Sequence, residues 1–297
     1  MTEAGRRLRL RAAPGNGERL PEVTTDAFLK FGPLIDTRLR VVTWNLWGRG
    51  GPWEARLHPI RSTLAALAPD LVALQEVWED GSRNQAAAIA ADLGFHHVFA
   101  SRYEIDGVAI GNAVLSRWPI ARHEVRPLPA PVELEELRNI IRVEVDGPRG
   151  PLELFTTHLN WRFDQSDVRQ EQVRTLARFV AESERRIMPP IVAGDFNAVP
   201  DSEEIRMLTG RVAVAVPRLV FHDSWEAAGN VAPGFTWSNA NPYARLDLEP
   251  DRRIDYIFVG WPRRGGAGHV LSCRTIGEAV DGVHPSDHLG LLAELRY

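Results

Sequence analysis

The chain has 297 residues, of which 44% are hydrophobic and 25% are charged, and its formal net charge is −4. This composition is that of an ordinary globular protein, long enough to bury one large core or two stacked sheets. The slight net negative charge argues against an obligate binder of polyanions, although it is compatible with a local basic rim on the surface.

Cys273 is the only cysteine, which excludes a disulfide within the chain and a thiolate metal cluster. A reducing, cytoplasmic location is therefore the simplest expectation. The arginines near the N-terminus precede no apolar run, so we expect no secretory signal, and no window is long enough to span a bilayer. Lys30 is the only lysine, so that contacts to phosphate groups would come from guanidinium groups.

The chain is predicted to divide into an N-terminal extension, residues 1–37, and one folded domain, residues 38–297. The extension has no sustained periodicity, apart from a helix-like patch at 26–31. β-Branched and apolar runs predict strands at 39–44, 70–74, 98–100, 109–115, 140–145, 152–157, 191–193, 253–259, 269–274 and 289–295. Helical spacing of apolar residues predicts helices at 56–67, 83–93, 167–184 and 202–208.

The order of these elements favours a particular fold class. Several strands follow one another without a helix between them, and the helices fall into two main groups. This order suits two sheets packed face to face with helices outside, rather than a doubly wound parallel sheet. No Gly-x-Gly-x-x-Gly segment follows a strand and opens a helix, and a Walker phosphate loop is absent.

The segment around Asp195 is the most informative motif. A short buried strand ends at Gly194, and Asp195 and Asn197 follow it two residues apart. In extended backbone such residues point to the same face, so both side chains are expected to look into one site. The structural alternative is a strand that simply runs into an Asx-type turn.

Other polar residues fall at strand boundaries in the same way. Taken with the Asp195 segment, they are Asn45, Glu76, His158, Asp195, Asn197, Asp255, Asp287 and His288. Each has a structural alternative, such as a turn residue for Asn45, a core histidine for His158 or a cap for Asp287. Their joint occurrence is far less expected by chance, and strand ends that meet at one rim are a common way to build a site.

These residue types suit metal-assisted phosphoryl transfer. Glu76, backed by Asn45, offers hard oxygen ligands for Mg²⁺. Asp195 can orient and deprotonate the attacking water, and Asn197 can hold that water or a phosphate oxygen.

The histidines suit the phosphoryl group itself. His288 can stabilise charge on the phosphoryl oxygens, with the otherwise unpaired Asp255 fixing its orientation. His158 can donate a hydrogen bond to the phosphate or to the leaving-group oxygen.

The motifs together resemble the endonuclease/exonuclease/phosphatase superfamily. The matching segments are Thr43-Trp44-Asn45, Leu74-Gln75-Glu76, the segment 111–116, Thr157-His158-Leu159, Gly194-Asp195-Phe196-Asn197, Arg253-Ile254-Asp255-Tyr256 and Ser286-Asp287-His288. The resemblance implies a four-layer α/β/β/α sandwich with two mostly antiparallel sheets. It also implies a Mg²⁺ or Mn²⁺ cofactor, with Glu76 as principal ligand, Asn45 assisting and Asp287 beside them.

Two positions depart from the apurinic endonuclease branch. Trp47 stands where that branch has an acidic residue, and His158 stands where it has a tyrosine. Both features resemble the sphingomyelinase, phosphatase and nuclease branches instead, which argues against abasic-site repair.

The substrate is less defined by the sequence. We assign Asn112, Arg138, Asn160 and Trp237 to substrate binding, and the loop 235–250 is the expected specificity element. Trp47, Trp53, Trp78 and Trp161 also lie beside motif residues, where they line a pocket or close the core.

Three functions follow from this sequence. The leading hypothesis is a Mg²⁺-dependent phosphoric-ester hydrolase, a phosphodiesterase or phosphatase, acting on a small phosphorylated molecule or a phosphodiester. The alternative is an endonuclease or exonuclease that uses the same centre on nucleic acid. A non-catalytic binding module on the same fold is a third, which the presence of all the expected acid and base groups disfavours.

Overall fold

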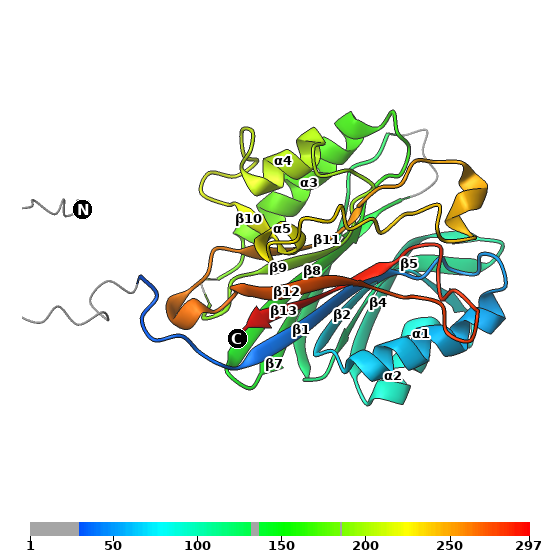
Figure 1. Cartoon of the computed structure of the whole chain (residues 1–297), viewed down its shortest axis with the longest axis horizontal. Coiled ribbons are helices and arrows are strands. Elements are labelled where there is room, and N and C mark those ends of the chain that lie inside the picture. The colour runs from blue at the N-terminus through cyan, green and yellow to red at the C-terminus, as the bar shows by residue number, and fades with distance from the viewer. Residues whose placement is uncertain (1–29, 132–136, 185) are drawn as a thin grey trace, which may run out of the picture.

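The structure, a computed structural model, describes residues 30–131, 137–184 and 186–297. Two β-sheets pack face to face, with helices on both outer faces, which confirms the predicted α/β/β/α sandwich (Figure 1). Residues 26–29 of the helix-like patch lie outside the described residues, and Lys30 and Phe31 form a turn. The first strand begins at Arg38.

The first sheet has seven strands and contains both the first and the last strand of the chain. Its order is β12-β13-β1-β2-β5-β4, with β3 paired to β2. Only the β1–β2 pair is parallel within this sheet. The strands are β1 (Arg38–Asn45), β2 (Leu71–Asp80), β3 (Arg83–Asn84), β4 (His96–Ile105), β5 (Val108–Ser116), β12 (Val270–Ile276) and β13 (Gly290–Arg296).

The second sheet has six strands in the order β10-β11-β9-β8-β7-β6, with β8 and β9 parallel. The strands are β6 (Ile120–Pro127), β7 (Asn139–Gly147), β8 (Gly150–His158), β9 (Ile191–Asp195), β10 (Phe221–Asp223) and β11 (Asp255–Gly260). The sequence analysis missed β6 and β10. The first is an exposed edge strand without an apolar run, and the second has three residues, too few to show a periodicity.

Helices cover both outer faces. α1 (Trp53–Leu67) and α2 (Gln85–Leu93) lie on the first sheet, and α3 (Ser166–Ala181) and α4 (Glu203–Thr209) lie on the second (Figure 1). Short helices α5 (Ser224–Ala227), η2 (Ala244–Asp247) and η3 (Arg264–Gly266) complete the order. Among the described residues, no helix is long and apolar enough to cross a membrane.

The helix predicted at 83–93 begins at Gln85, two residues later than predicted. Arg83 and Asn84 pair with β2 as the short strand β3. Asn84 then caps α2, because its side-chain oxygen accepts the backbone N–H of Ala87 at 2.9 Å.

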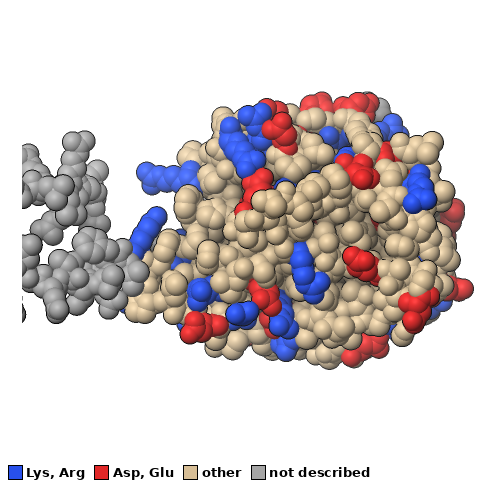
Figure 2. Space-filling view, in the orientation of Figure 1, with Lys and Arg blue, Asp and Glu red and all other residues tan. Residues whose placement is uncertain are grey.

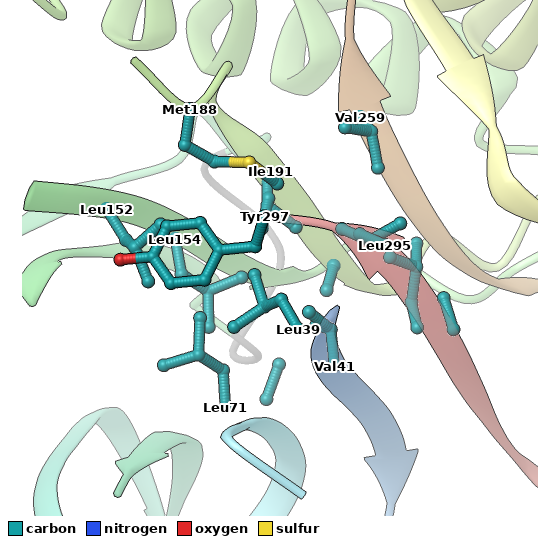
Figure 3. Close-up of a cluster of buried hydrophobic side chains, with 14 of the residues drawn as sticks. Leu39, Val41, Leu71, Leu152, Leu154, Met188, Ile191, Val259, Leu295 and Tyr297 are labelled. Atoms are coloured by element: carbon teal, nitrogen blue, oxygen red, sulfur yellow. The ribbon is translucent and has the colours of Figure 1, made fainter. Parts of the chain in front are cut away.

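The core follows the two-residue alternation of the strands. In β1, Leu39 and Val41 point between the sheets, whereas Val42 packs on the side of α1 and α2. In β9, Ile191 points between the sheets in the same way (Figure 3). The alternation therefore fixes which residues of each strand face the other sheet.

Gly194 allows β8 and β9 to approach closely beside the site. A Cβ atom at this position would lie 2.1 Å from the backbone oxygen of Thr157 in the neighbouring strand. Because both atoms belong to paired backbone, neither can move without breaking the ladder. Glycine is therefore required one residue before Asp195.

We predict that Gly194→Ala lowers the free energy of unfolding by about 3 kcal/mol, because overpacking forces a backbone shift. Gly81→Ala is the matched control. The φ of Gly194 is 159° and that of Gly81 is 47°, but a Cβ at Gly81 meets nothing within 4 Å, so that only the left-handed strain of about 1 kcal/mol applies there. Urea unfolding of both variants measures the difference, and equal losses would contradict this account.

Candidate active site

The side chains of the site continue the inward alternation of the core. On β8, Thr156 lies two residues before His158 and is fully buried. On β9, Ala193 lies two residues before Asp195 and faces between the sheets. In the register of the second sheet, Asp195 pairs with His158 on one side and Asp255 on the other. Three polar side chains therefore stand side by side at one end of the inter-sheet core.

Asn45 meets this row from the opposite sheet. It ends β1 on the inward face, and its amide nitrogen donates to Oδ2 of Asp195 at 3.0 Å. The same nitrogen donates to Oε1 of Glu76 at 3.2 Å. Its side-chain oxygen accepts the backbone N–H of Trp47 at 2.9 Å, which fixes the orientation of the amide.

A β-bulge aims Glu76 at the site. The sequence placed the end of the strand at residue 74, but β2 continues to Asp80, with a register shift between Leu74 and Val77. Leu74 and Val77 both face the helices, so the bulge absorbs the extra residue. Glu76 takes up a positive φ of 53°, which is uncommon for a residue of this type, and its side chain lines the main cavity.

Asp255 and His288 form a hydrogen-bonded pair. Nδ1 of His288 lies 2.9 Å from Oδ2 of Asp255, and both side chains are buried. Burial opposes a charge on His288, but the carboxylates of Asp255, Asp195 and Asp287 outweigh it and raise the pKa of the imidazole to about 10. His288 is therefore an imidazolium at neutral pH, with Nε2 lying 3.8 Å from Oδ2 of Asp195.

His158, unlike His288, is held neutral. Burial, helped by the positive charges of Arg138 and His288, lowers the pKa of His158 well below its usual value. Nη1 of Arg138 lies 3.0 Å from Nδ1 of His158, and because a guanidinium can only donate, Nδ1 must be the acceptor. The other ring nitrogen, Nε2, lies between the amide nitrogen of Asn197, at 3.0 Å, and Oδ2 of Asp195, at 3.5 Å.

Asp195 is the carboxylate that these groups surround. Burial, followed by the charge of Asp255, raises the pKa of Asp195 to about 7. The backbone N–H of Asn197 donates to its Oδ1 at 2.9 Å, in the Asx-type turn considered as the structural alternative. Asn197 has a positive φ of 49° and its amide nitrogen lies 3.0 Å from Nε2 of His158, so the turn also carries it into the site.

These groups open into a cavity of about 820 Å³. The predicted site residues that line it are Asn45, Glu76, Arg138, His158, Asp195, Asn197, Trp237, Asp287 and His288. Asp255 lies behind His288, fully buried. The structure thus brings together residues that the sequence separates by more than two hundred positions.

Two predicted substrate-binding residues do not line this cavity. Asn112 lies beneath it, donating to the backbone and side-chain oxygens of Asn139. The side chain of Asn160 is bonded to Gln165 and to Gln172 of α3. Both asparagines are buried, and in this arrangement they hold neighbouring segments together.

The tryptophans near the motifs divide into two groups. Trp47, Trp161 and Trp237 line the main cavity. Trp53 and Trp78 pack edge to face, with ring centroids 5.4 Å apart, and line a separate cavity of about 580 Å³ against α1 and α2.

Two groups of buried donor atoms lend themselves to a cation. Asp195, Asp255 and His288 offer ligand atoms within 4.8 Å of one another. Nδ1 of His288 and Oδ2 of Asp255 are already hydrogen-bonded to each other, however, which occupies two of these ligand atoms. The carboxylates of Glu76 and Asp287, which both line the cavity, are therefore the better donors.

The properties of Asp287 support this choice. Burial raises the pKa of Asp287 to about 7, and the nearby charge of Glu76 acts in the same direction. Two neighbouring carboxylates that repel each other, one of them buried, suit a bound cation. Asn45 turns its nitrogen towards the carboxylates, so that in this orientation it bridges Glu76 and Asp195 as a donor rather than offering its oxygen.

Arg56 is a supporting residue that the sequence analysis missed. It was expected to be part of a helix face, but it is fully buried and donates to five backbone oxygens, those of Leu46, Trp47, Gly48, Gly50 and Pro285. It thereby ties the loop after Asn45 to the segment that carries Asp287 and His288. A buried arginine inside an otherwise ordinary helical pattern leaves no signal in one sequence.

Comparisons with known proteins agree with this site. The sequence model of the Endonuclease/Exonuclease/phosphatase family matches residues 42–288. Tyrosyl-DNA phosphodiesterase 2 of Gallus gallus is 28% identical over 262 residues, which are 85% of this chain and 65% of that protein. Protein angel homolog 2 of Danio rerio is 27% identical over 174 residues, 54% of this chain and 30% of that protein. The chain thus spans less than two thirds of the length of these two relatives.

Solved structures share the fold. An endonuclease/exonuclease/phosphatase from Beutenbergia cavernae is 26% identical with a TM-score of 0.68, covering 87% of this chain and 71% of that chain. D. rerio TDP2, complexed with single strand DNA product, has a TM-score of 0.71 at 22% identity and covers 88% of this chain and 100% of that chain. The family match reaches from β1 to His288 and takes in every residue of the site described above. This chain belongs to the Endonuclease/Exonuclease/phosphatase family.

Proposed function

We propose that this protein is a divalent-metal-dependent phosphoric-ester hydrolase, a phosphodiesterase or phosphatase, with Mg²⁺ as the expected cation and Mn²⁺ as its alternative. The observation that carries the proposal is the surrounding of the Asp195 carboxylate. A neutral histidine, an imidazolium and two asparagines contact it at the wall of one open cavity. A group so arranged has the chemistry of a general base beside donors for a developing anion.

Glu76 and Asp287 are the residues proposed to hold the cation, which when bound would act as a Lewis acid towards a phosphoryl oxygen. Both are carboxylates, the oxygen ligands that Mg²⁺ prefers. Asn45 keeps Glu76 and Asp195 in place through its two hydrogen bonds.

Asp195 is proposed to accept the proton of the attacking water. Burial and the charge of Asp255 raise its pKa to about 7, so that it is a stronger base than an exposed aspartate and is still largely ionised above neutral pH. The backbone N–H of Asn197 holds its Oδ1 and leaves Oδ2 facing the two histidines.

The two histidines are proposed to bind the phosphoryl group from different sides. His288, held charged by Asp255, would stabilise negative charge as it develops on the phosphoryl oxygens. His158, held neutral, would donate a hydrogen bond to a phosphate or leaving-group oxygen.

A nuclease remains the second candidate function. It is favoured by the likeness to a tyrosyl-DNA phosphodiesterase and to a structure complexed with single strand DNA product. The formal net charge of −4 does not favour it, and acidic and basic side chains both occur on the face shown in Figure 2.

Removing the base tests the proposal. We expect Asp195→Asn to lower kcat for an aryl phosphodiester or phosphomonoester by roughly 10²- to 10³-fold, because one preorganised group is lost. A chelator should abolish the activity of the wild-type protein, and Mg²⁺ should restore it. Asp201→Asn, in which the side chain is almost fully exposed, is the control and should keep wild-type activity. Equal rates in the wild type, the chelated sample and Asp195→Asn would remove the enzymatic interpretation.

Salt dependence separates the two functions. A nuclease that contacts several phosphates should lose affinity for a generic duplex or single strand steeply as salt rises, by about 10³-fold or more between 50 and 200 mM. We expect instead weak binding with a shallow slope, because the formal net charge of the chain is −4. Fluorescence anisotropy with labelled DNA measures the slope, and a steep slope would favour the nuclease.

The raised pKa of Asp195 also has a consequence for stability. Its carboxyl group has a pKa of about 7 in the folded chain and an ordinary value, near 4, in the unfolded chain. The protonated form thus stabilises the fold below pH 4, and this contribution is lost as the pH rises towards 7.

We therefore expect Asp195→Asn, in chelator, to be more stable than the wild type by about 4 kcal/mol at pH 8 and by almost nothing at pH 4. Urea unfolding at the two pH values measures this difference. The exposed control Asp201→Asn should show none. A variant that is less stable than the wild type at pH 8 would contradict the assignment of a buried, penalised charge to Asp195.

A further inference from the structure

Arg252 lies in a row of stacked side chains beside the proposed catalytic centre. Isolated antiparallel bridges join Trp237 to Arg252 on one side and to His288 on the other. Directly paired residues point to the same face, and the contacts confirm it. The rings of Trp237 and His288 lie 5.0 Å apart, and the guanidinium of Arg252 lies 6.0 Å from the Trp237 ring.

An exposed aromatic ring covers the far side of Arg252. The guanidinium lies 4.5 Å from the ring centroid of Phe163, whose exposed fraction is 58%. Arg252 itself is buried to nine tenths but lines the main cavity together with Trp237 and His288. Ring contacts on two sides hold the planar guanidinium in one orientation at the cavity wall.

The neighbouring arginine shows what a purely structural role looks like here. Arg253 is buried and forms an ion pair with Asp223 at 2.5 Å, and neither residue lines the main cavity. Arg252, by contrast, is paired with Glu249, a partly exposed residue that lines the same cavity. Among the described residues, Nε has no hydrogen-bond partner in either arginine, so the two differ in their counter-ions and in their access to the cavity. The counter-ion of Arg252 is thus a side chain that can move aside.

The row of Arg252, Trp237 and His288 also sets the distance between the two groups that a substrate can place at its ends. Neighbouring strands are about 4.8 Å apart, so the backbones of Arg252 and His288, with Trp237 between them, are separated by roughly 10 Å. A substrate whose reacting phosphoryl group contacts His288 can therefore place a second group at Arg252 across the face of Trp237. The guanidinium fork matches a phosphate in shape and charge.

We propose that Arg252 is an anion-binding subsite for a second phosphate group of the substrate, lying across Trp237 from the phosphoryl group that reacts. Glu249 occupies the subsite in the absence of substrate and is displaced by that phosphate. The proposal rests on the proposed function, because the reacting group is placed at His288. It narrows the substrate class to phosphoric esters that carry a second phosphate.

A pair of chromogenic diesters tests the subsite. Thymidine 5′-(4-nitrophenyl phosphate) has one phosphate, and the same compound with a 3′-phosphate has two. In the wild type we expect the second phosphate to lower KM by about tenfold, the effect of one charge-assisted contact, with little change in kcat. Arg252→Leu should abolish this advantage and Arg252→Lys should keep part of it, whereas Glu249→Gln should enlarge it. Arg245→Leu, an exposed arginine bonded to the backbone oxygen of Asn239, is the control and should keep the full advantage.

Binding without turnover gives a second measurement that does not depend on catalysis. In chelator, thymidine 3′,5′-bisphosphate should raise the Tm of the wild type more than thymidine 5′-monophosphate does, and the difference should vanish in Arg252→Leu. If Arg252→Leu does not fold, Arg252→Lys and Glu249→Gln carry the same comparison in opposite directions.

Failure of the proposed function and failure of the subsite give different results in these experiments. No hydrolysis of either diester or of an aryl phosphomonoester, together with a bisphosphate advantage in Tm that depends on Arg252, would sink the proposed function and keep the subsite. Hydrolysis of both with equal KM in the wild type would overturn the subsite, and so would an equal loss for both in Arg252→Leu, since Arg252 would then contact the reacting group. A third substrate, in which the 3′-phosphate continues into a second nucleotide, distinguishes the sources. An equal advantage assigns the subsite to a nucleotide chain, and a smaller one assigns it to a terminal phosphate.

Discussion

The burial of one carboxylate, Asp195, is the constraint on which the site depends. An ionised group at the end of an apolar core is unfavourable unless donors replace the water that it loses. Here the donors come from both sheets, with Asn45 from the first and His158 from the second, while His288 approaches from the segment before β13. The sandwich thus does more than fill its core, because its facing strands must also end in polar groups that complement one another.

Local backbone strain appears where this arrangement is completed. Glu76 and Asn197 both have positive φ values, and each sits where regular extended backbone would aim the side chain elsewhere. Such conformations cost of order 1–3 kcal/mol and persist only where the surroundings enforce them. The bulge in β2 enforces the first, and the Asx-type turn on Asp195 supports the second. Arg56 and the amide of Asn241, which donates to the backbone oxygens of Ser286 and Asp287, hold the loops on the other side.

The sequence predicted the fold class and the members of the site better than it predicted their contacts. Apolar alternation marks strands such as β1 and β9, and it also fixes that Asn45 and Asp195 face inward, so convergence could be inferred. Long-range pairing left no such trace. The exposed strand β6, the bulge at Glu76 and the five backbone contacts of Arg56 all depend on partners distant in the chain. Asn112 and Asn160 were assigned to substrate binding because the sequence does not distinguish an asparagine that bonds to a substrate from one that bonds to a neighbouring segment.

The two histidines show most clearly why roles in the site require the structure. Both are buried, and both lie within 4 Å of the same oxygen of Asp195, so burial and this shared neighbour do not distinguish them. Their other neighbours do. Arg138 can only donate, and it keeps His158 neutral, whereas Asp255 can only accept when ionised, and it keeps His288 charged. The result is one neutral donor and one cation on either side of a single base, a separation of pKa values of the kind that assigns acid and base roles in hydrolytic sites. Burial lowers the pKa of both imidazoles, so the separation depends on their charged neighbours, with Arg138 just before β7 beside His158 and Asp255 at the start of β11 beside His288.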